Sequence, residues 1–173
     1  DEAEQHAQVY RAIVEQLPGD FAPVVQQAQG GIARGWLVKA HRALLWGDAA
    51  EGRRCLAQAG SAGAVVDKLY VGEVVHQLLA IEIEQGAPVA DSRAEQLTAH
   101  WRAVRGAPPA PSFSAALELG RVFAYYSAGR YAAVPGQVQR ALRSNPRLAF
   151  NRGLLSLLVR SVRNAPTARK QAA

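Results

Sequence analysis

The segment from Gly129 to Pro146 constrains the fold of this chain more than any other. Gly129 is a small residue that can close a helix, and Tyr131 follows directly after the expected turn. Apolar residues then recur at about 3.6-residue spacing until a proline ends the pattern. These positions are Val134, Val138, Ala141, Leu142 and Pro146. One pair of amphipathic helices cannot bury its apolar face alone, so we expect further helices to stack on it.

The rest of the chain repeats its apolar residues with the same helical period. The helical patterns cover residues 2–17, 21–29, 32–46, 48–59, 65–85, 92–105, 112–127, 131–144 and 148–162. No segment alternates apolar and polar residues over the length of a strand. The sequence therefore predicts a short, compact all-α array of about seven or eight helices without a β-sheet.

Local signals predict where these helices begin and end. Gly30-Gly31 predicts a break or kink between segments 21–29 and 32–46, and Gly47 followed by Asp48 predicts a helix end and a new cap. We expect Asp91 or Ser92 to cap the helix over 92–105, and Ser112 or Ser114 to cap the helix over 112–127. The apolar residues of 65–85 are too many for one stripe, so this helix is expected to be central and covered on several sides.

Charge and composition bear on the domain organisation and on the partners. Residues 1–100 carry a net charge of −5, whereas residues 101–173 carry +11 with Glu118 as their only acid. The switch falls near the proline-rich linker 106–111, and 164–173 is expected to be a disordered tail. We predict one domain over 1–163, with the linker as the alternative boundary. A basic half indicates an anionic partner, although a solvated basic face is the plainer alternative.

Several classes of protein do not match the sequence. Cys55 is the only cysteine, so an intrachain disulfide is excluded, and its place in a helix favours inert packing over an activated thiolate. No apolar run approaches the roughly 20 residues of a membrane span, and no signal peptide pattern is present. The absence of methionine, even at position 1, predicts a processed end or a cut within a longer protein.

No constellation of side chains predicts catalysis. Glu73 and His76 have the Glu-x-x-His spacing of di-iron bundles, but the second such pair and two further glutamates are missing. His41 and His100 have no neighbour at metal-ligand spacing, and no glycine-rich stretch has the lysine of a phosphate loop. We therefore predict no catalytic, cofactor-binding or metal-binding residue and no cofactor.

The basic half offers candidate residues for partner binding. Tyrosines lie among arginines near 121–131, a pattern that suits nucleic-acid binding but is more typical of core packing. The last helix is leucine-rich and flanked by arginines, which suits either an anionic membrane surface or the water-facing cap of a helical array. The candidate partner-binding residues are Arg121, Tyr125, Arg130, Arg140, Arg143, Arg147, Arg152, Arg160 and Arg163.

The pattern from Gly129 to Pro146 resembles the tetratricopeptide repeat. Laying Gly47 over Gly129 places Leu56 over Val138 and Ala59 over Ala141, as a diverged earlier copy would. Trp36 also agrees with that family's pattern, whereas Val134, Pro135 and Gly52 depart from it. The resemblance implies stacked helix pairs that bind a peptide or protein in a concave groove.

Three segments resemble the C-terminal helical extension of bacterial family 2 glycosyltransferases. They are Arg140-Ala-Leu-Arg-Ser-Asn-Pro-Arg-Leu148 with Gly153–Leu158, and the helix–Gly-Asp–helix unit Ala43–Ala50. The nucleotide-sugar domain of that family, with its metal-binding Asp-x-Asp, is not part of this chain. The resemblance implies an accessory region of a larger cytoplasmic enzyme at the inner face of the membrane.

Three functional hypotheses follow. The first is a non-catalytic interaction module, the C-terminal part of a bacterial glycosyltransferase. The second is a free-standing tetratricopeptide-type adaptor for a peptide or protein partner. The third is a basic nucleic-acid-binding module, whose retention on a polyanion should fall steeply with salt. The sequence does not identify the partner or the oligomeric state.

Overall fold

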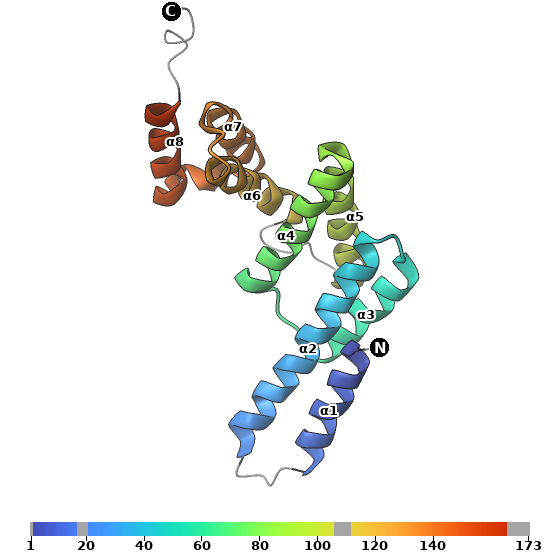
Figure 1. Cartoon of the computed structure of the whole chain (residues 1–173). Helices are drawn as coiled ribbons and strands as arrows, with labels where there is room; N and C mark the ends of the chain where they lie inside the picture. The colour runs from blue at the N-terminus through green and yellow to red at the C-terminus, as the bar shows by residue number, and fades with distance from the viewer. Residues whose placement is uncertain (1, 17–20, 106–111, 166–173) are drawn as a thin grey trace, which may run out of the picture. The chain divides into compact units, whose positions relative to one another are not determined.

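The computed structural model describes residues 2–16, 21–105 and 112–165 (Figure 1). These residues form eight α-helices joined by turns and short 3-10 helices, and they contain no β-strand. The all-α prediction is therefore confirmed. The helices are α1 (Glu2–Gln16), α2 (Ala22–Leu45), α3 (Ala49–Ser61), α4 (Lys68–Gln85), α5 (Ala87–Arg105), α6 (Phe113–Ser127), α7 (Val134–Ser144) and α8 (Arg152–Asn164). The 3-10 helices η2 (Tyr131–Ala133) and η3 (Pro146–Phe150) precede α7 and α8.

The chain divides into two compact units, each built from two stretches of sequence. Unit 1 lies within residues 1–74 and 92–110, and unit 2 lies within 75–91 and 111–173. Helices α4 and α5 therefore contribute to both units. The sequence indicates a boundary only at the linker, because a division inside a continuous helix leaves no mark in composition. The linker 106–111 and the tail beyond Ala165 lie outside the described residues.

In unit 1, α1 and α3 both pack against α2. Leu37, Ala40 and Leu44 of α2 are buried, and Leu56 and Ala59 of α3 are buried as predicted. Gly52 gives α3 its close approach to α2: a Cβ at this position would lie 2.6 Å from Cδ2 of Leu44. The departure of Gly52 from the repeat pattern therefore has a packing reason.

The structure contradicts the predicted break at Gly30-Gly31, because α2 runs unbroken through both glycines. A glycine in a helix interior costs about 1 kcal/mol relative to alanine, so a tertiary contact has to offset it. The ring of Tyr10 in α1 supplies that contact at Gly31, where a Cβ would lie 3.3 Å from the tyrosine Cζ. The predicted cap at Asp20 lies outside the described residues, and Phe21 at the start of α2 makes no side-chain cap.

Two predicted helix caps are confirmed. The carboxylate of Asp48 accepts a hydrogen bond from the Glu51 N–H at 3.0 Å, and the hydroxyl of Ser112 accepts one from the Ala115 N–H at 3.2 Å. Such caps satisfy an N–H group that has no partner within its own helix. Gly47 ends α2 with a φ of 95°, a conformation that favours glycine.

Three other boundaries differ from prediction. Helix α4 begins at Lys68 rather than residue 65, because Asp67 accepts the Tyr70 N–H at 2.7 Å. Helix α5 begins at Ala87, directly after the turn at Gly86, so neither Asp91 nor Ser92 caps it. Helix α8 begins at Arg152 rather than residue 148, because residues 146–150 form η3.

Helix α4 is only partly covered. Tyr70, Val74 and Leu78 are fully buried, but Leu69 and Ile83 are exposed. The expectation of a helix covered on several sides is therefore wrong for Leu69 and Ile83. Apolar composition alone does not show which side of a helix meets solvent.

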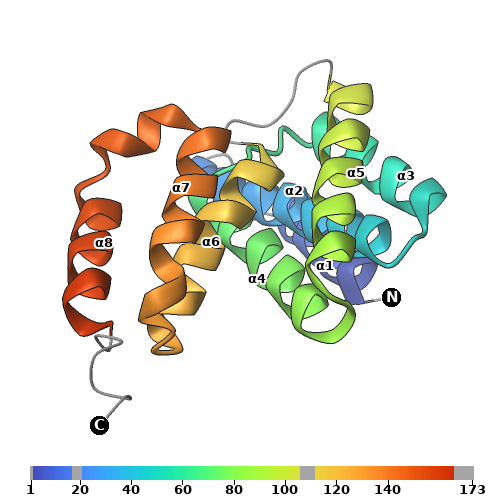
Figure 2. The ribbon, with the colours of Figure 1, turned by 90° about the horizontal axis from the view of Figure 1, so that it is seen from above.

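In unit 2, α7 packs against both α6 and α8, as the view from above shows (Figure 2). The core of this group consists of Val122, Val134, Val138, Ala141 and Leu154. Pro135 lies in the first turn of α7, where a proline needs no N–H partner, as predicted. These contacts fix the direction in which the outer faces of α7 and α8 point.

The tetratricopeptide prediction gains no specific support from the helix ends. Gly47 and Gly129, which the predicted repeat superimposes, both have positive φ, and the N–H that follows each donates to the carbonyl five residues earlier. Gly63 ends α3 with the same bond but has no place in the superposition. The shared feature is thus a general way to end a helix, and the repeat stays a prediction.

Candidate functional site

Helix α7 separates a buried apolar face from an exposed basic face. Val134, Val138 and Ala141 are buried in the core of unit 2. Arg140 and Arg143, three residues apart and therefore on one side of the helix, are exposed. Packing of the apolar face thus fixes both guanidinium groups toward solvent.

Two asparagine turns place further arginines between α7 and α8. The side chain of Asn145 accepts the Arg147 N–H at 3.2 Å, and that of Asn151 accepts the Leu154 N–H at 3.1 Å. Because Asn151 caps α8, Arg152 is the first residue of that helix. Phe150 lies next to this cap and is almost fully exposed.

The outer face of α8 carries both arginines and apolar side chains. Leu154 and Ser161 are buried, and they mark the side of the helix that faces the core. Arg152, Arg160 and Arg163 are exposed on the remaining surface. Helix α8 is therefore not simply an array cap with arginines outward, since part of its apolar surface also faces solvent.

Together these elements form a positively charged surface. We call it the basic surface and define it as Arg130, Arg140, Arg143, Arg147, Arg152, Arg160 and Arg163, all of which are exposed. No aspartate or glutamate follows Glu118 in the sequence, so no carboxylate from this half of the chain neutralises them. Seven of the nine predicted partner-binding residues belong to this surface.

Arg121 does not belong to the basic surface, which corrects its assignment as a partner-binding residue. Its side chain is 3 % exposed and forms ion pairs with Glu82, Glu118 and Asp91, at 2.7, 2.6 and 2.8 Å. Burial alone would lower the pKa of Arg121, but the carboxylates of Glu82 and Asp91, with which it is paired, raise it. Arg121 therefore joins parts of α4, α5 and α6 within unit 2 and stays charged.

Tyr125 is half-buried and takes part in packing rather than forming a free stacking platform. It packs against the core of unit 2, and the guanidinium of Arg130 lies 5.7 Å from the centre of its ring. The neighbouring Tyr126 and Tyr131 meet edge to face, with ring centres 5.3 Å apart. The tyrosines near Arg130 thus stabilise the η2 turn.

The other chemical candidates from the sequence can be placed in the described helices. In the described part of the chain, no group of three or more His, Cys, Asp and Glu side chains could hold a metal ion. The carboxylate of Glu73 lies 3.9 Å from Nη2 of Arg34. His41 is buried in unit 1, where its ring meets that of Tyr70 edge to face at 5.4 Å.

The environment of Cys55 confirms its prediction as a core residue. The thiol is fully buried and donates to Oε1 of Glu51 at 3.5 Å. Burial, with Glu51 nearby, raises the pKa of Cys55 to about 11 despite the cations of Lys39 and Arg54. The thiolate that nucleophilic chemistry requires is therefore disfavoured.

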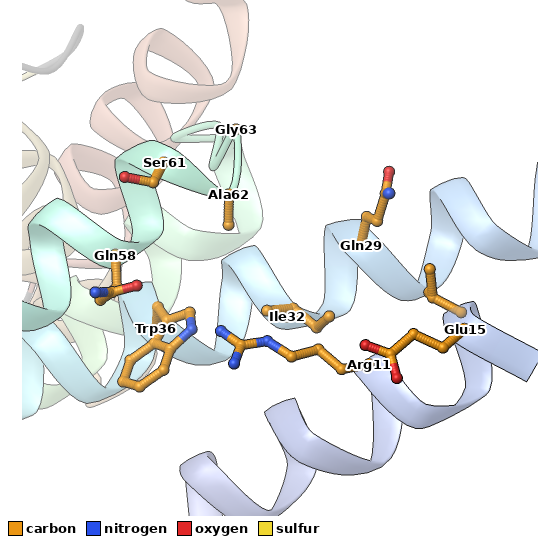
Figure 3. Close-up of a pocket in the computed structure, with 10 residues that line it drawn as sticks. Arg11, Glu15, Gln29, Ile32, Trp36, Gln58, Ser61, Ala62 and Gly63 are labelled. Atoms are coloured by element: carbon orange, nitrogen blue, oxygen red, sulfur yellow. The ribbon is translucent and has the colours of Figure 1, made fainter.

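A groove in unit 1 escaped prediction. It has a volume of about 560 Å³ and lies between α1 and α3, with Ile32 and Trp36 of α2 at its floor (Figure 3). Arg11 of α1 extends across it toward Trp36, and Gln58 of α3 lines the opposite wall. The arrangement depends on two helices that both pack on α2, so no local sequence pattern signals it.

The described helices include none with the length and apolar character needed to cross a bilayer. Comparison with known proteins finds no matching family model, no matching curated protein and no matching solved structure.

Proposed function

We propose that this chain is a non-catalytic helical interaction module that binds an anionic partner through the basic surface of unit 2. The observation that carries the proposal is the set of seven exposed arginines, fixed on α7, α8 and the turns beside them, in a segment without acidic residues. Such a field attracts anions over about one Debye length, roughly 10 Å at 0.1 M salt.

A binding assay with polyphosphate or heparin tests this proposal. Replacing Arg140, Arg143 and Arg147 by glutamine should weaken retention on either polyanion and reduce its dependence on salt. The matched control replaces the exposed Arg42, Arg53 and Arg102 of unit 1 by glutamine, which removes the same net charge elsewhere. Equal losses in the two triple variants would show that net charge, and not this surface, governs binding.

We also propose that the module is the accessory C-terminal region of a bacterial family 2 glycosyltransferase. The helix–Gly-Asp–helix corner at Gly47 and Asp48 and the leucine-rich last helix support this proposal. The test is the coding sequence that adjoins residues 1–173: an α/β domain with an Asp-x-Asp motif supports the proposal. Turnover of a nucleotide sugar by these 173 residues alone would overturn it.

The groove of unit 1 favours a second candidate, an adaptor that binds a peptide. Its floor is apolar and its walls carry Arg11, Glu15 and Gln58, a combination that suits a short peptide with mixed side chains. Peptides selected by display against the protein should lose affinity when Ser61 at the wall becomes arginine. They should keep it in an Ala57→Arg control, which is exposed on α3 but does not line the groove.

A further inference from the structure

Helix α8 exposes a continuous apolar stripe. Leu155, Val159 and Val162 are spaced by four and three residues, so they lie along one side of the helix. They are 41 %, 50 % and 63 % exposed, whereas Leu154 and Ser161, seven residues apart, are fully buried. The stripe is therefore distinct from the face that packs in unit 2.

Arginines border this stripe. Arg152 lies three residues before Leu155 and Arg163 lies four residues after Val159, so both are neighbours of the stripe on the helix surface. A long arginine side chain can lie along apolar surface while its guanidinium reaches an anionic group at the edge. The two kinds of side chain thus present one combined apolar and cationic face.

We infer that the anionic partner of the basic surface is the surface of a lipid bilayer, on which α8 lies with its apolar stripe among the headgroups. This inference rests on the proposed function and adds the class of partner. A polynucleotide would meet the arginines but would gain nothing from three exposed aliphatic side chains, whereas the headgroup region of an anionic bilayer matches both.

The dimensions and charge of α8 agree with a helix that lies on a bilayer rather than crossing it. Its 13 residues span only about 20 Å, short of the roughly 30 Å hydrocarbon core. Each arginine near an anionic membrane strengthens binding about fivefold. Arg140, Arg143 and Arg147 lie next to α8 in sequence and add to this attraction.

Vesicle co-sedimentation of the whole chain tests the inference, with vesicles of phosphatidylcholine alone or mixed in equal parts with phosphatidylglycerol. We expect binding to the mixed vesicles at least about tenfold tighter than to phosphatidylcholine. Val159→Ser with Val162→Ser should weaken that binding about tenfold and leave polyphosphate retention unchanged. Arg152, Arg160 and Arg163 changed together to glutamine should weaken vesicle binding about 100-fold.

Two matched controls separate the stripe from general effects. Ile83→Ser with Phe123→Ser removes two other exposed apolar side chains of unit 2 and should change vesicle binding less than about twofold. Arginine-to-lysine changes at residues 152, 160 and 163 keep the charge and should preserve binding to the mixed vesicles. Circular dichroism of each variant verifies that its helical content is unchanged.

The possible outcomes distinguish this inference from the proposed function. Retention on polyphosphate without vesicle binding overturns the bilayer as partner and leaves the basic surface as the binding site. Vesicle binding that is unaffected by the serine pair also overturns it, since charge alone would then suffice. Tight binding to nucleic acid or an acidic protein without vesicle binding assigns that other partner, and binding to no anion at all refutes the proposed function itself.

Discussion

Arg121 and Glu82 form an ion pair in which Nε of the arginine donates a hydrogen bond to a carboxylate oxygen at 2.7 Å. The pair connects α6 to the C-terminal half of α4 within unit 2. Glu118 accepts from a second nitrogen of the same guanidinium at 2.6 Å. A buried guanidinium needs carboxylates on several of its donors, so this cluster has a structural role within unit 2.

Replacing Arg121 by methionine should lower the free energy of unfolding by about 3–5 kcal/mol. The reason is that Glu82 and Glu118, whose side chains are only 17 % and 16 % exposed, would lose their counter-charge. Urea unfolding followed by circular dichroism measures the effect. The triple variant Arg121→Met, Glu82→Gln, Glu118→Gln should recover most of the loss. A loss below about 1 kcal/mol in the single variant would contradict a neutralising role for Arg121.

Much of the helical pattern could be predicted because it depends on neighbours along the chain. Gly47, Asp48 and Ser112 act on backbone groups within a few residues, so their roles are readable locally. Gly30-Gly31 could not be read in the same way. Whether two glycines break a helix depends on what packs against them, and Tyr10 lies about 20 positions earlier in the sequence.

Among the candidate partner-binding residues, too, some could be predicted from local spacing and others depend on distant contacts. Arg140 and Arg143 were predictable as exposed residues, since helical spacing sets them opposite the apolar positions of α7. Arg121 was not, because Glu82, its first partner, lies 39 residues away in sequence. The exposed stripe of α8 was equally hidden, since an apolar residue that meets solvent looks in sequence like one that meets the core.

Glu51 should make the stability of the protein depend on pH in the acid range. Hydrogen bonds from Arg54 and then Lys39 lower the pKa of Glu51 from 4.5 to about 2. Because the folded state favours the carboxylate, this stabilisation is complete above pH 4.5 and is lost as pH falls toward 2. The difference in unfolding free energy between wild type and Glu51→Gln should therefore shrink over this range.

Urea titrations at a series of pH values measure that difference. The control is Glu95→Gln, which removes an exposed carboxylate on α5 and should change stability by less than about 0.5 kcal/mol. If the wild type keeps a constant advantage in unfolding free energy over Glu51→Gln down to about pH 2, the negative charge of Glu51 does not contribute to stability.

Cys55 should resist thiol reagents in the folded protein. Its pKa, raised from 9.0 to about 11 by burial and by Glu51, reduces the thiolate fraction at about pH 8 by roughly 100-fold. Burial of the sulfur slows the reaction further. Alkylation with iodoacetamide, followed by mass spectrometry, should be rapid in urea and at least about 100-fold slower without it. Comparable rates in both conditions would show that the sulfur is accessible.

Two glycine substitutions in unit 1 should change stability in opposite directions. Gly30→Ala adds a methyl group where no side chain or distant backbone atom lies within 4 Å, and it should stabilise α2 by about 0.5–1 kcal/mol through helix propensity.

Gly52→Ala gains the same propensity, but its Cβ would lie 2.6 Å from Cδ2 of Leu44, which is buried and cannot move aside freely. The net effect should be a loss of about 1–3 kcal/mol, measured by urea unfolding. A stable Gly52→Ala protein would mean that α3 can shift away from α2, and a destabilised Gly30→Ala protein would contradict the unbroken course of α2.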